Sequence, residues 1–278
     1  MQPVKIAFFD IDGTLVDPAT GKISPKTVEA LQRLEEKGIR RVIVTGRPPA
    51  SLPSFGPLRF DAMATFNGCL CYTEKEIIYD APIAPGEVRQ VLQNATALGR
   101  PISVAVKDRL VANGVDRDLS DYYRLANLIL TPSDDFDSAC REDVYQIMLG
   151  SRPEEHEAIT RGAEGVKIAV SWDRAVDVIP VGGGKGVSIL KILEYFDLDA
   201  SNGLDVYVWQ FAKEHYGFGL LPHSDEHKNG IASELLNLKG CSLGDMRTIL
   251  ATYELDPSEI LPDSEVFEKE NLRESYTL

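Results

Sequence analysis

Two carboxylates near the start of the chain, Asp10 and Asp12, are its residues with the clearest potential for chemistry. They lie two positions apart and directly follow an apolar run, residues 4–9, that is typical of a buried parallel strand. Like charges this close are unfavourable unless a cation or a proton offsets them. Mg²⁺ is a suitable cation, because it prefers oxygen ligands and takes one or two carboxylates together with substrate phosphate.

Gly13 and Thr14 complete the segment DIDGT after this strand. Glycine permits a sharp turn there and leaves backbone N–H groups able to meet an anion. A bare D-x-D pair is common and also suits a turn that caps a helix. The whole segment DIDGT after two phenylalanines is far more specific, so we predict a phosphate and metal site at this strand end.

A second polar segment, Thr45-Gly46-Arg47, follows a second apolar run at residues 42–44. Between the two runs, Ser24 and Pro25 predict the start of a helix and Gly38 predicts its end. Strand, helix and strand in this order indicate a βαβ unit, whose strands end where open α/β sheets bind ligands. Thr45 alone suits any strand, and Arg47 suits a phosphate contact and a surface ion pair equally.

Lys185 lies in the segment GGGKG and opens a helix predicted over residues 187–196. A cation there can neutralise both Asp10 and a phosphoryl group in transfer. The spacing G-x-x-x-x-G-K-[ST] of a P-loop is missing, which excludes a P-loop NTPase. The remaining alternative is a solvated lysine without a role.

The rest of the chain has a mixed pattern. Apolar runs and turn residues predict strands at 63–66, 70–72, 77–79, 102–106, 109–112, 144–149, 166–170 and 175–180, with helices at 87–98, 119–128 and 153–162. After residue 200, strands at 206–209 and 216–221 and helices at 231–238 and 246–253 are weaker predictions. The acidic and polar segment 255–278 has little to bury and is predicted to be a solvated tail.

The segments FFDIDGTL, TGR and GGGKG resemble motifs I to III of the haloacid dehalogenase (HAD) superfamily of phosphohydrolases. Asn67-Gly68 resembles the N-G turn of its Cof-type branch. The resemblance covers residues 4–200. It implies an α/β fold with a Rossmann-like parallel-sheet core, residues 1–81 and 181–254, into which an α+β cap domain, residues 82–180, is inserted.

The same resemblance implies a mechanism and a set of site residues. Asp10 is expected to be a nucleophile that forms an aspartyl-phosphate, and Asp12 the general acid and then the general base. Thr45 and Lys185 are expected to complete the catalytic group. The expected substrate-binding residues are Gly13, Thr14, Gly46, Arg47, Asn67 and Gly68. The expected cofactor is Mg²⁺, held by Asp10, Asp12 and one further acid.

The family's fourth motif, G-D-x-x-N-D, is not found after Lys185. By spacing, Asp205 is the best replacement for its metal ligand and Asp225 the next, whereas Asp245 lacks a preceding strand. A Mg²⁺ ion held by few protein ligands binds weakly, so we expect reduced or absent activity if no acid substitutes. His156, His215, His223 and His227 do not form a convincing metal set.

The function predicted from these patterns is hydrolysis of phosphomonoesters of small metabolites, with sugar phosphates foremost. One rival is a phosphometabolite-binding protein that has lost turnover together with the fourth motif. Another is a phosphotransferase that passes the aspartyl-phosphate to a second sugar.

The composition of the chain limits the kinds of molecule that it is expected to bind. A net charge of −14 argues against nucleic acid, which requires clustered Lys and Arg. Apolar residues make up 44% of the 278, enough for a sizeable core, but no apolar stretch reaches the ~18 residues of a membrane helix. The four cysteines have neither zinc-site nor disulfide-framework spacing. The first residues do not have the basic segment followed by a long apolar run that is typical of a secretory leader. We therefore expect a cytoplasmic protein with no membrane partner.

Overall fold

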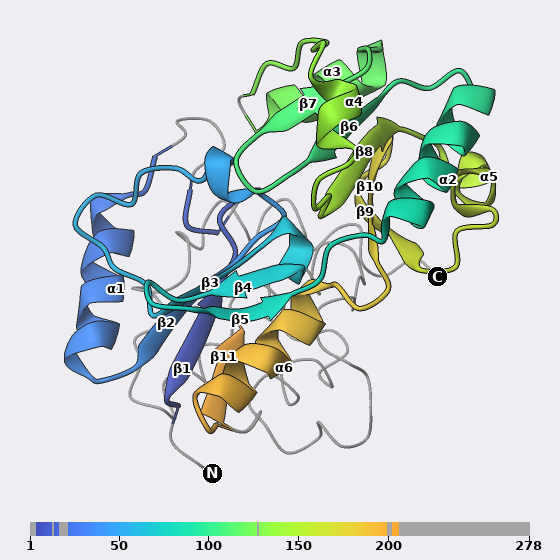
Figure 1. Ribbon diagram of the computed structural model, residues 1–278. Helices are drawn as coiled ribbons and strands as arrows, with labels where there is room; N and C mark the ends of the chain where they lie inside the picture. Colours follow the sequence, from blue (N-terminus) through green and yellow to red (C-terminus); the bar gives the residue numbers. More distant parts are fainter. Residues whose placement is uncertain (1–3, 13, 17–21, 127, 199–201, 206–278) are drawn as a thin grey trace, which may run out of the picture.

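The computed structural model describes residues 4–12, 14–16, 22–126, 128–198 and 202–205. In this part the chain forms two sheets, which lie beside one another and are joined by two linkers (Figure 1). The linkers are residues 81–84 and 181–184. The strands and helices predicted after residue 205, Asp225 and the tail 255–278 lie outside the described residues.

The first sheet has the strand order β11-β1-β2-β3-β4-β5. Neighbours from β11 to β3 pair in parallel, whereas β3, β4 and β5 pair antiparallel. Strand β11 was not predicted and pairs with β1. The strands are β1 (Ile6–Phe9), β2 (Arg40–Val44), β3 (Ala62–Thr65), β4 (Leu70–Tyr72), β5 (Ile77–Asp80) and β11 (Gly203–Asp205).

Helices α1 (Pro25–Glu36) and α6 (Lys185–Tyr195) flank this sheet (Figure 1). Successive strand residues point to opposite faces, so β1 buries Phe9 on the side of α1 and Phe8 on the side of α6. As predicted, Ser24 caps α1, because its Oγ accepts a hydrogen bond from the backbone N–H of Thr27 at 3.0 Å.

The second sheet has the order β7-β6-β8-β10-β9, and all its neighbours pair antiparallel. Its strands are β6 (Ile102–Ala105), β7 (Leu110–Ala112), β8 (Gln146–Gly150), β9 (Val166–Trp172) and β10 (Ala175–Pro180). Its helices are α2 (Pro85–Ala97), α3 (Arg117–Leu125), α4 (Phe136–Ala139) and α5 (His156–Thr160).

Some predicted bounds differ from the structure. Helix α6 begins at Lys185 rather than at 187, because Gly184, with a φ of 124°, already serves as its N-cap. The predicted helix 153–162 is shorter, since Pro153–Glu155 forms a 3₁₀ turn before α5. Helix α4 was not predicted, because four residues are too few for a helical period to be visible.

The two sheets share one apolar cluster. Phe66, Cys69 and Leu70 from the first sheet and its loops pack with residues of the second, including Leu119 and Tyr145. This cluster places the loop after β3 against the face of the second sheet that carries α3.

Candidate active site

Asp10 and Lys185 form a buried ion pair at the carboxyl end of β1. Lys185 Nζ donates to Asp10 Oδ2 at 2.6 Å, and the backbone N–H of Ile11 donates to Asp10 Oδ1 at 2.7 Å. Only 8% of the Asp10 side chain and 10% of the Lys185 side chain are exposed. The ammonium therefore lies where it can offset negative charge on, or next to, this carboxylate.

Burial and charge act on Asp10 in opposite directions. Burial is the largest influence and raises the pKa of Asp10 above its ordinary value, and the charge of Asp12 adds to this effect. The ion pair with Lys185 and the hydrogen bond from Ile11 lower the pKa. A carboxylate so placed is poorly hydrated, which suits a nucleophile.

Asp12 is paired with Arg47. Arg47 Nη2 donates to Asp12 Oδ1 at 2.7 Å and Arg47 Nε donates to Oδ2 at 2.9 Å, which is a bidentate geometry. The Asp12 side chain is 49% exposed and that of Arg47 is 14% exposed. The hydrogen bonds to Asp12 raise the pKa of Arg47. The structure thus shows an ion pair of Arg47, and its contact with a phosphate stays a prediction.

The turn after β2 lies beside the end of β1, because Phe9 pairs with Ile43 in the parallel register. Thr45 is fully buried, and its Oγ1 accepts a hydrogen bond from the backbone N–H of Arg47 at 3.1 Å. The hydroxyl can then donate its own hydrogen to an anion. Gly46 packs tightly against Asn67, because a Cβ there would lie 3.0 Å from Asn67 Oδ1.

Asn67 and Gly68 connect this turn to the start of α6. The backbone N–H of Asn67 donates to the carbonyl oxygen of Thr45 at 3.0 Å. Gly68 has a φ of 84°, and a Cβ there would lie 2.5 Å from the carbonyl oxygen of Gly184 and 2.7 Å from Ser188 Oγ. The close approach of Gly68 thus allows the loop before Lys185 to pack against it.

The structure brings Asp10 to Lys185, Asp12 to Arg47, and Thr45 and Gly46 to Asn67, and it packs Gly68 against Gly184, the residue before Lys185. Thr14 is half-buried in the turn after Asp10, and its backbone N–H donates to the carbonyl oxygen of Ile11 at 3.3 Å. Gly13 lies outside the described residues. Asp205 ends β11 opposite Phe8, and only its backbone is described. The roles of all these residues stay predictions.

The oxygen atoms at the end of β1 are of the chemical types that Mg²⁺ prefers as ligands. Asp10 supplies a carboxylate and Asp12 a backbone carbonyl, and Mg²⁺ completes such a set with phosphate and water. The described residues contain no group of three or more His, Cys, Asp or Glu side chains arranged for a metal ion. Asp205, whose side chain lies outside the described part of the structure, therefore stays the predicted further acidic ligand.

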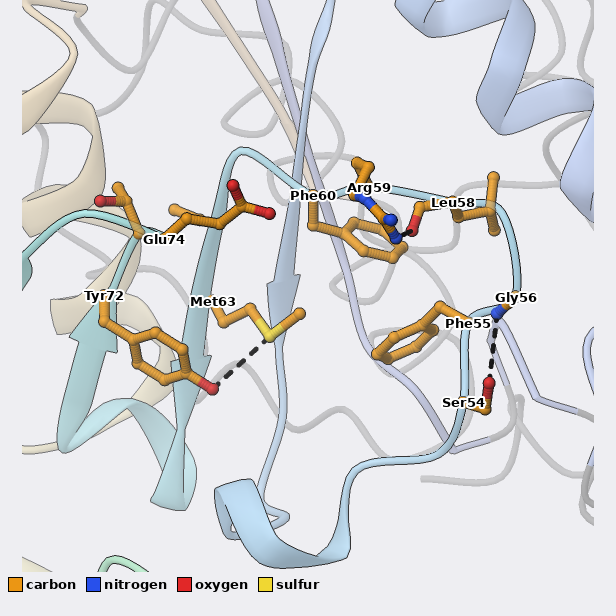
Figure 2. Close-up of a pocket in the computed structure, with 11 residues that line it drawn as sticks. Ser54, Phe55, Gly56, Leu58, Arg59, Phe60, Met63, Tyr72 and Glu74 are labelled. Atoms are coloured by element: carbon orange, nitrogen blue, oxygen red, sulfur yellow. Dashed lines mark hydrogen bonds between the residues drawn. The ribbon is translucent and has the colours of Figure 1, made fainter.

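A cavity of about 320 Å³ is lined by other residues, most of which Figure 2 labels. It is bounded by the loop 54–60 and by the strand residues Met63 and Tyr72, whose hydroxyl lies 3.6 Å from Met63 Sδ. None of the described residues that line it belongs to the predicted site. Its lining is mostly apolar and holds neither of the two carboxylates of the DIDGT segment, so we do not assign the chemistry to it.

One residue next to the site, Asp177, was missed by the sequence reasoning. Asp177 lies on β10 with 1% exposure, and both its oxygens accept hydrogen bonds, from Asn67 and from Tyr122. The signal in the sequence was a single acid inside the apolar segment AVDVIP. A charged side chain in a buried strand requires hydrogen-bond or ion-pair partners, so this acid could have been expected to bind other polar residues.

With this geometry in place, the comparisons with known proteins identify the family. Residues 7–204 match the haloacid dehalogenase-like hydrolases, and the chain belongs to this family. The predicted fold class, a Rossmann-like α/β fold, is confirmed by structural neighbours from the same superfamily, as is the prediction of an HAD-type phosphatase.

Three relatives illustrate the match. The Bacillus subtilis (strain 168) protein "Putative phosphatase YkrA" is 27% identical over 206 residues, which are 70% of this chain and 76% of that protein. The HAD subclass IIB sugar phosphatase BT4131 has a TM-score of 0.66 at 25% identity, over 76% of this chain and 84% of its own. BT1666 from Bacteroides thetaiotaomicron has a TM-score of 0.70 at 17% identity, over 91% and 96%.

Among the helices that the structure describes, none has both the length and the apolar character that crossing a membrane requires.

Proposed function

We propose that this protein is a Mg²⁺-dependent phosphomonoesterase that acts on small phosphorylated metabolites, sugar phosphates foremost, through an aspartyl-phosphate on Asp10. The observation that carries the proposal is the buried pair of Asp10 and Lys185 at the end of β1. The sugar-phosphatase name of BT4131 supports the substrate class.

In the first step an oxygen of Asp10 attacks phosphorus, and the bond from phosphorus to the ester oxygen breaks. Asp12 gives a proton to the departing alkoxide, which leaves as an alcohol. In the second step Asp12 takes a proton from water, the water oxygen bonds to phosphorus, and the bond to Asp10 breaks. Free phosphate and the original carboxylate result, so no further reactant is needed.

The neighbouring side chains have distinct tasks in these steps. Lys185 offsets the charge that gathers between Asp10 and the phosphoryl oxygens, and Thr45 donates a hydrogen bond to one of those oxygens. Arg47 must release Asp12, because a carboxylate held by a guanidinium on both oxygens cannot deliver a proton to a leaving group. Arrival of the substrate phosphate offers Arg47 an alternative partner of the same geometry.

Asp10, the carbonyl of Asp12 and Asp205 are the proposed Mg²⁺ ligands. When bound, Mg²⁺ would offset negative charge at the phosphoryl group. Asp205 is proposed because β11 lies next to β1, with Phe8 and Asp205 paired in the register. We further propose that residues 82–180 form the cap and residues 1–81 with 181–254 the core, since the second sheet is built entirely from strands β6 to β10.

The test is turnover of a generic aryl phosphate with Mg²⁺ and with a chelator, followed by a panel of sugar phosphates. Mg²⁺-dependent turnover with a preference for sugar phosphates supports the proposal. Binding of inorganic phosphate without any turnover would support the binding-protein alternative instead. Transfer of phosphate to an added acceptor sugar in preference to water would indicate a phosphotransferase.

A further inference from the structure

The turn formed by Phe66 and Asn67 is hydrogen-bonded to both ends of the segment Thr45–Arg47. The backbone N–H of Asn67 donates to the Thr45 carbonyl at 3.0 Å, and that of Phe66 donates to the Arg47 carbonyl at 3.1 Å. The position of Thr45–Arg47 therefore depends on the conformation of the turn after β3.

The side chain of Asn67 reaches from this turn to the second sheet. Its Oδ1 lies against Gly46, and its Nδ2 donates to Asp177 Oδ2 at 2.9 Å. Asp177 is held in turn by the hydroxyl of Tyr122, which donates to Oδ1 at 2.9 Å. A continuous chain of contacts thus runs from helix α3 through strand β10 to the turn at Gly46.

The backbone of the turn after β3 is strained. Phe66 has a φ of 52° and Asn67 a φ of 54°, both in the left-handed region, which is a true outlier for a bulky residue such as Phe66. Such conformations persist only where the surroundings over-determine them. Here the ring of Phe66 stacks on Tyr145 with centroids 4.7 Å apart, and Tyr145 donates to Asp80 at 2.8 Å. The second sheet and its flanking residues therefore hold the strained turn.

We propose that Asn67 and Asp177 are a positioning pair, through which the second sheet fixes the place of Thr45–Arg47 at the active site. In this role the pair acts through the turn and not on the reacting atoms. Its catalytic consequence rests on the proposed function, but its structural part, the coupling between Asp177 and the turn, does not. A contact that only holds the two sheets together would stabilise the fold without changing the turn.

The structural part is tested by amide hydrogen exchange at Phe66 and Asn67. Asp177→Ala removes the acceptor, whereas Asp177→Asn keeps an oxygen that can accept from Asn67. We expect exchange at both amides to rise at least about tenfold in Asp177→Ala, as for loss of a hydrogen bond to a charged group, and to return towards wild type in Asp177→Asn.

Ser103→Ala is the matched control, because it removes another buried hydrogen bond of the same sheet, the one between Ser103 and Tyr123 at 2.7 Å. It should leave exchange at Phe66 and Asn67 unchanged. Equal exchange at these amides in Asp177→Ala and Ser103→Ala would overturn the proposal, whether or not the protein is an enzyme.

The catalytic part is tested with Asn67→Gly and Asp177→Ala, singly and together. Glycine keeps the left-handed backbone but removes the side chain. We expect each single variant to lower kcat for an aryl phosphate about tenfold or more with little change in KM, and the double variant to lose no more than either single one. Independent, additive losses, or a change in thermal stability alone, would contradict the positioning role. A wild-type protein without turnover would instead contradict the proposed function.

Discussion

Lys185 Nζ donates to Asp10 Oδ2 at 2.6 Å, although 175 positions separate the two residues in the chain. The loop of residues 181–184 and the start of α6 bring the ammonium to the end of β1, and both side chains are almost fully buried there. Removing one member of a buried pair leaves the other charge without compensation.

Lys185→Met is therefore expected to lower the free energy of unfolding by about 3–5 kcal/mol. Lys191→Met is the matched control on the same helix, because Lys191 pairs with Glu194 at an exposed position and its loss should change stability little. The double variant Asp10→Asn with Lys185→Met should recover part of the loss. Urea denaturation measures all of these, and equal stabilities of the two lysine variants would contradict the buried pair.

Arg47→Met tests whether Arg47 exchanges Asp12 for substrate phosphate. Its pair with the half-exposed Asp12 should contribute no more than about 1 kcal/mol to folding. Loss of a charged contact to phosphate should raise KM for a phosphate ester about tenfold. Arg117→Met, which changes an arginine with an exposed side chain on α3, serves as the control. An unchanged KM in Arg47→Met would confine Arg47 to its ion pair.

Gly68→Ala and Gly38→Ala separate backbone strain from steric collision. Both glycines have a positive φ, but a Cβ at Gly38 would meet nothing within 4 Å, whereas one at Gly68 would collide with Gly184 and Ser188. Gly38→Ala should cost about 1–2 kcal/mol of stability and leave turnover intact. Gly68→Ala should cost more and lower kcat, because the loop before Lys185 must shift. Equal effects of the two substitutions on kcat would refute the packing role of Gly68.

The stability of the fold is expected to depend on pH through Asp118, whose pKa is lowered by three arginines. The hydrogen bond from Arg152 is the first cause that lowers the pKa of Asp118 below its ordinary value of 3.8, with Arg100 and Arg174 adding to it. A depressed pKa contributes stability that is present above the unfolded value and is lost as the pH falls through the folded value. Asp118→Asn should therefore be less stable than wild type at neutral pH, and the difference should close below pH 3.8. A difference that stays constant with pH would contradict this account.

Much of the fold was predictable, because the deciding signals are local. Ser24, Pro25 and Gly38 act within a turn or so of α1, and the segments at residues 10–14 and 45–47 directly follow apolar runs that become β1 and β2. Lys185 was predicted as a site residue from the glycine-rich segment GGGKG that contains it. These signals depend on neighbouring residues and do not require the tertiary structure.

The pairings between distant side chains could not be predicted. Whether Arg47 binds Asp12 or remains available depends on how the turns after β1 and β2 pack, 35 positions apart. The contact between Asn67 and Asp177 spans 110 positions and two sheets. Strand β11 is too short for a period to be visible, and its place is decided by pairing with β1.

The central claim is that Asp10 carries the phosphoryl group during turnover. Acid quenching of the protein during turnover of an aryl phosphate with Mg²⁺, followed by peptide mass spectrometry, tests it most directly. Asp108→Asn is the control, because its side chain is exposed and lies on the second sheet's side of the molecule. We expect one phosphoryl group on the peptide containing Asp10 in wild type and in Asp108→Asn, and none, with no turnover, in Asp10→Asn. Turnover at the wild-type rate in Asp10→Asn, or a phosphoryl group on another peptide, would contradict the account.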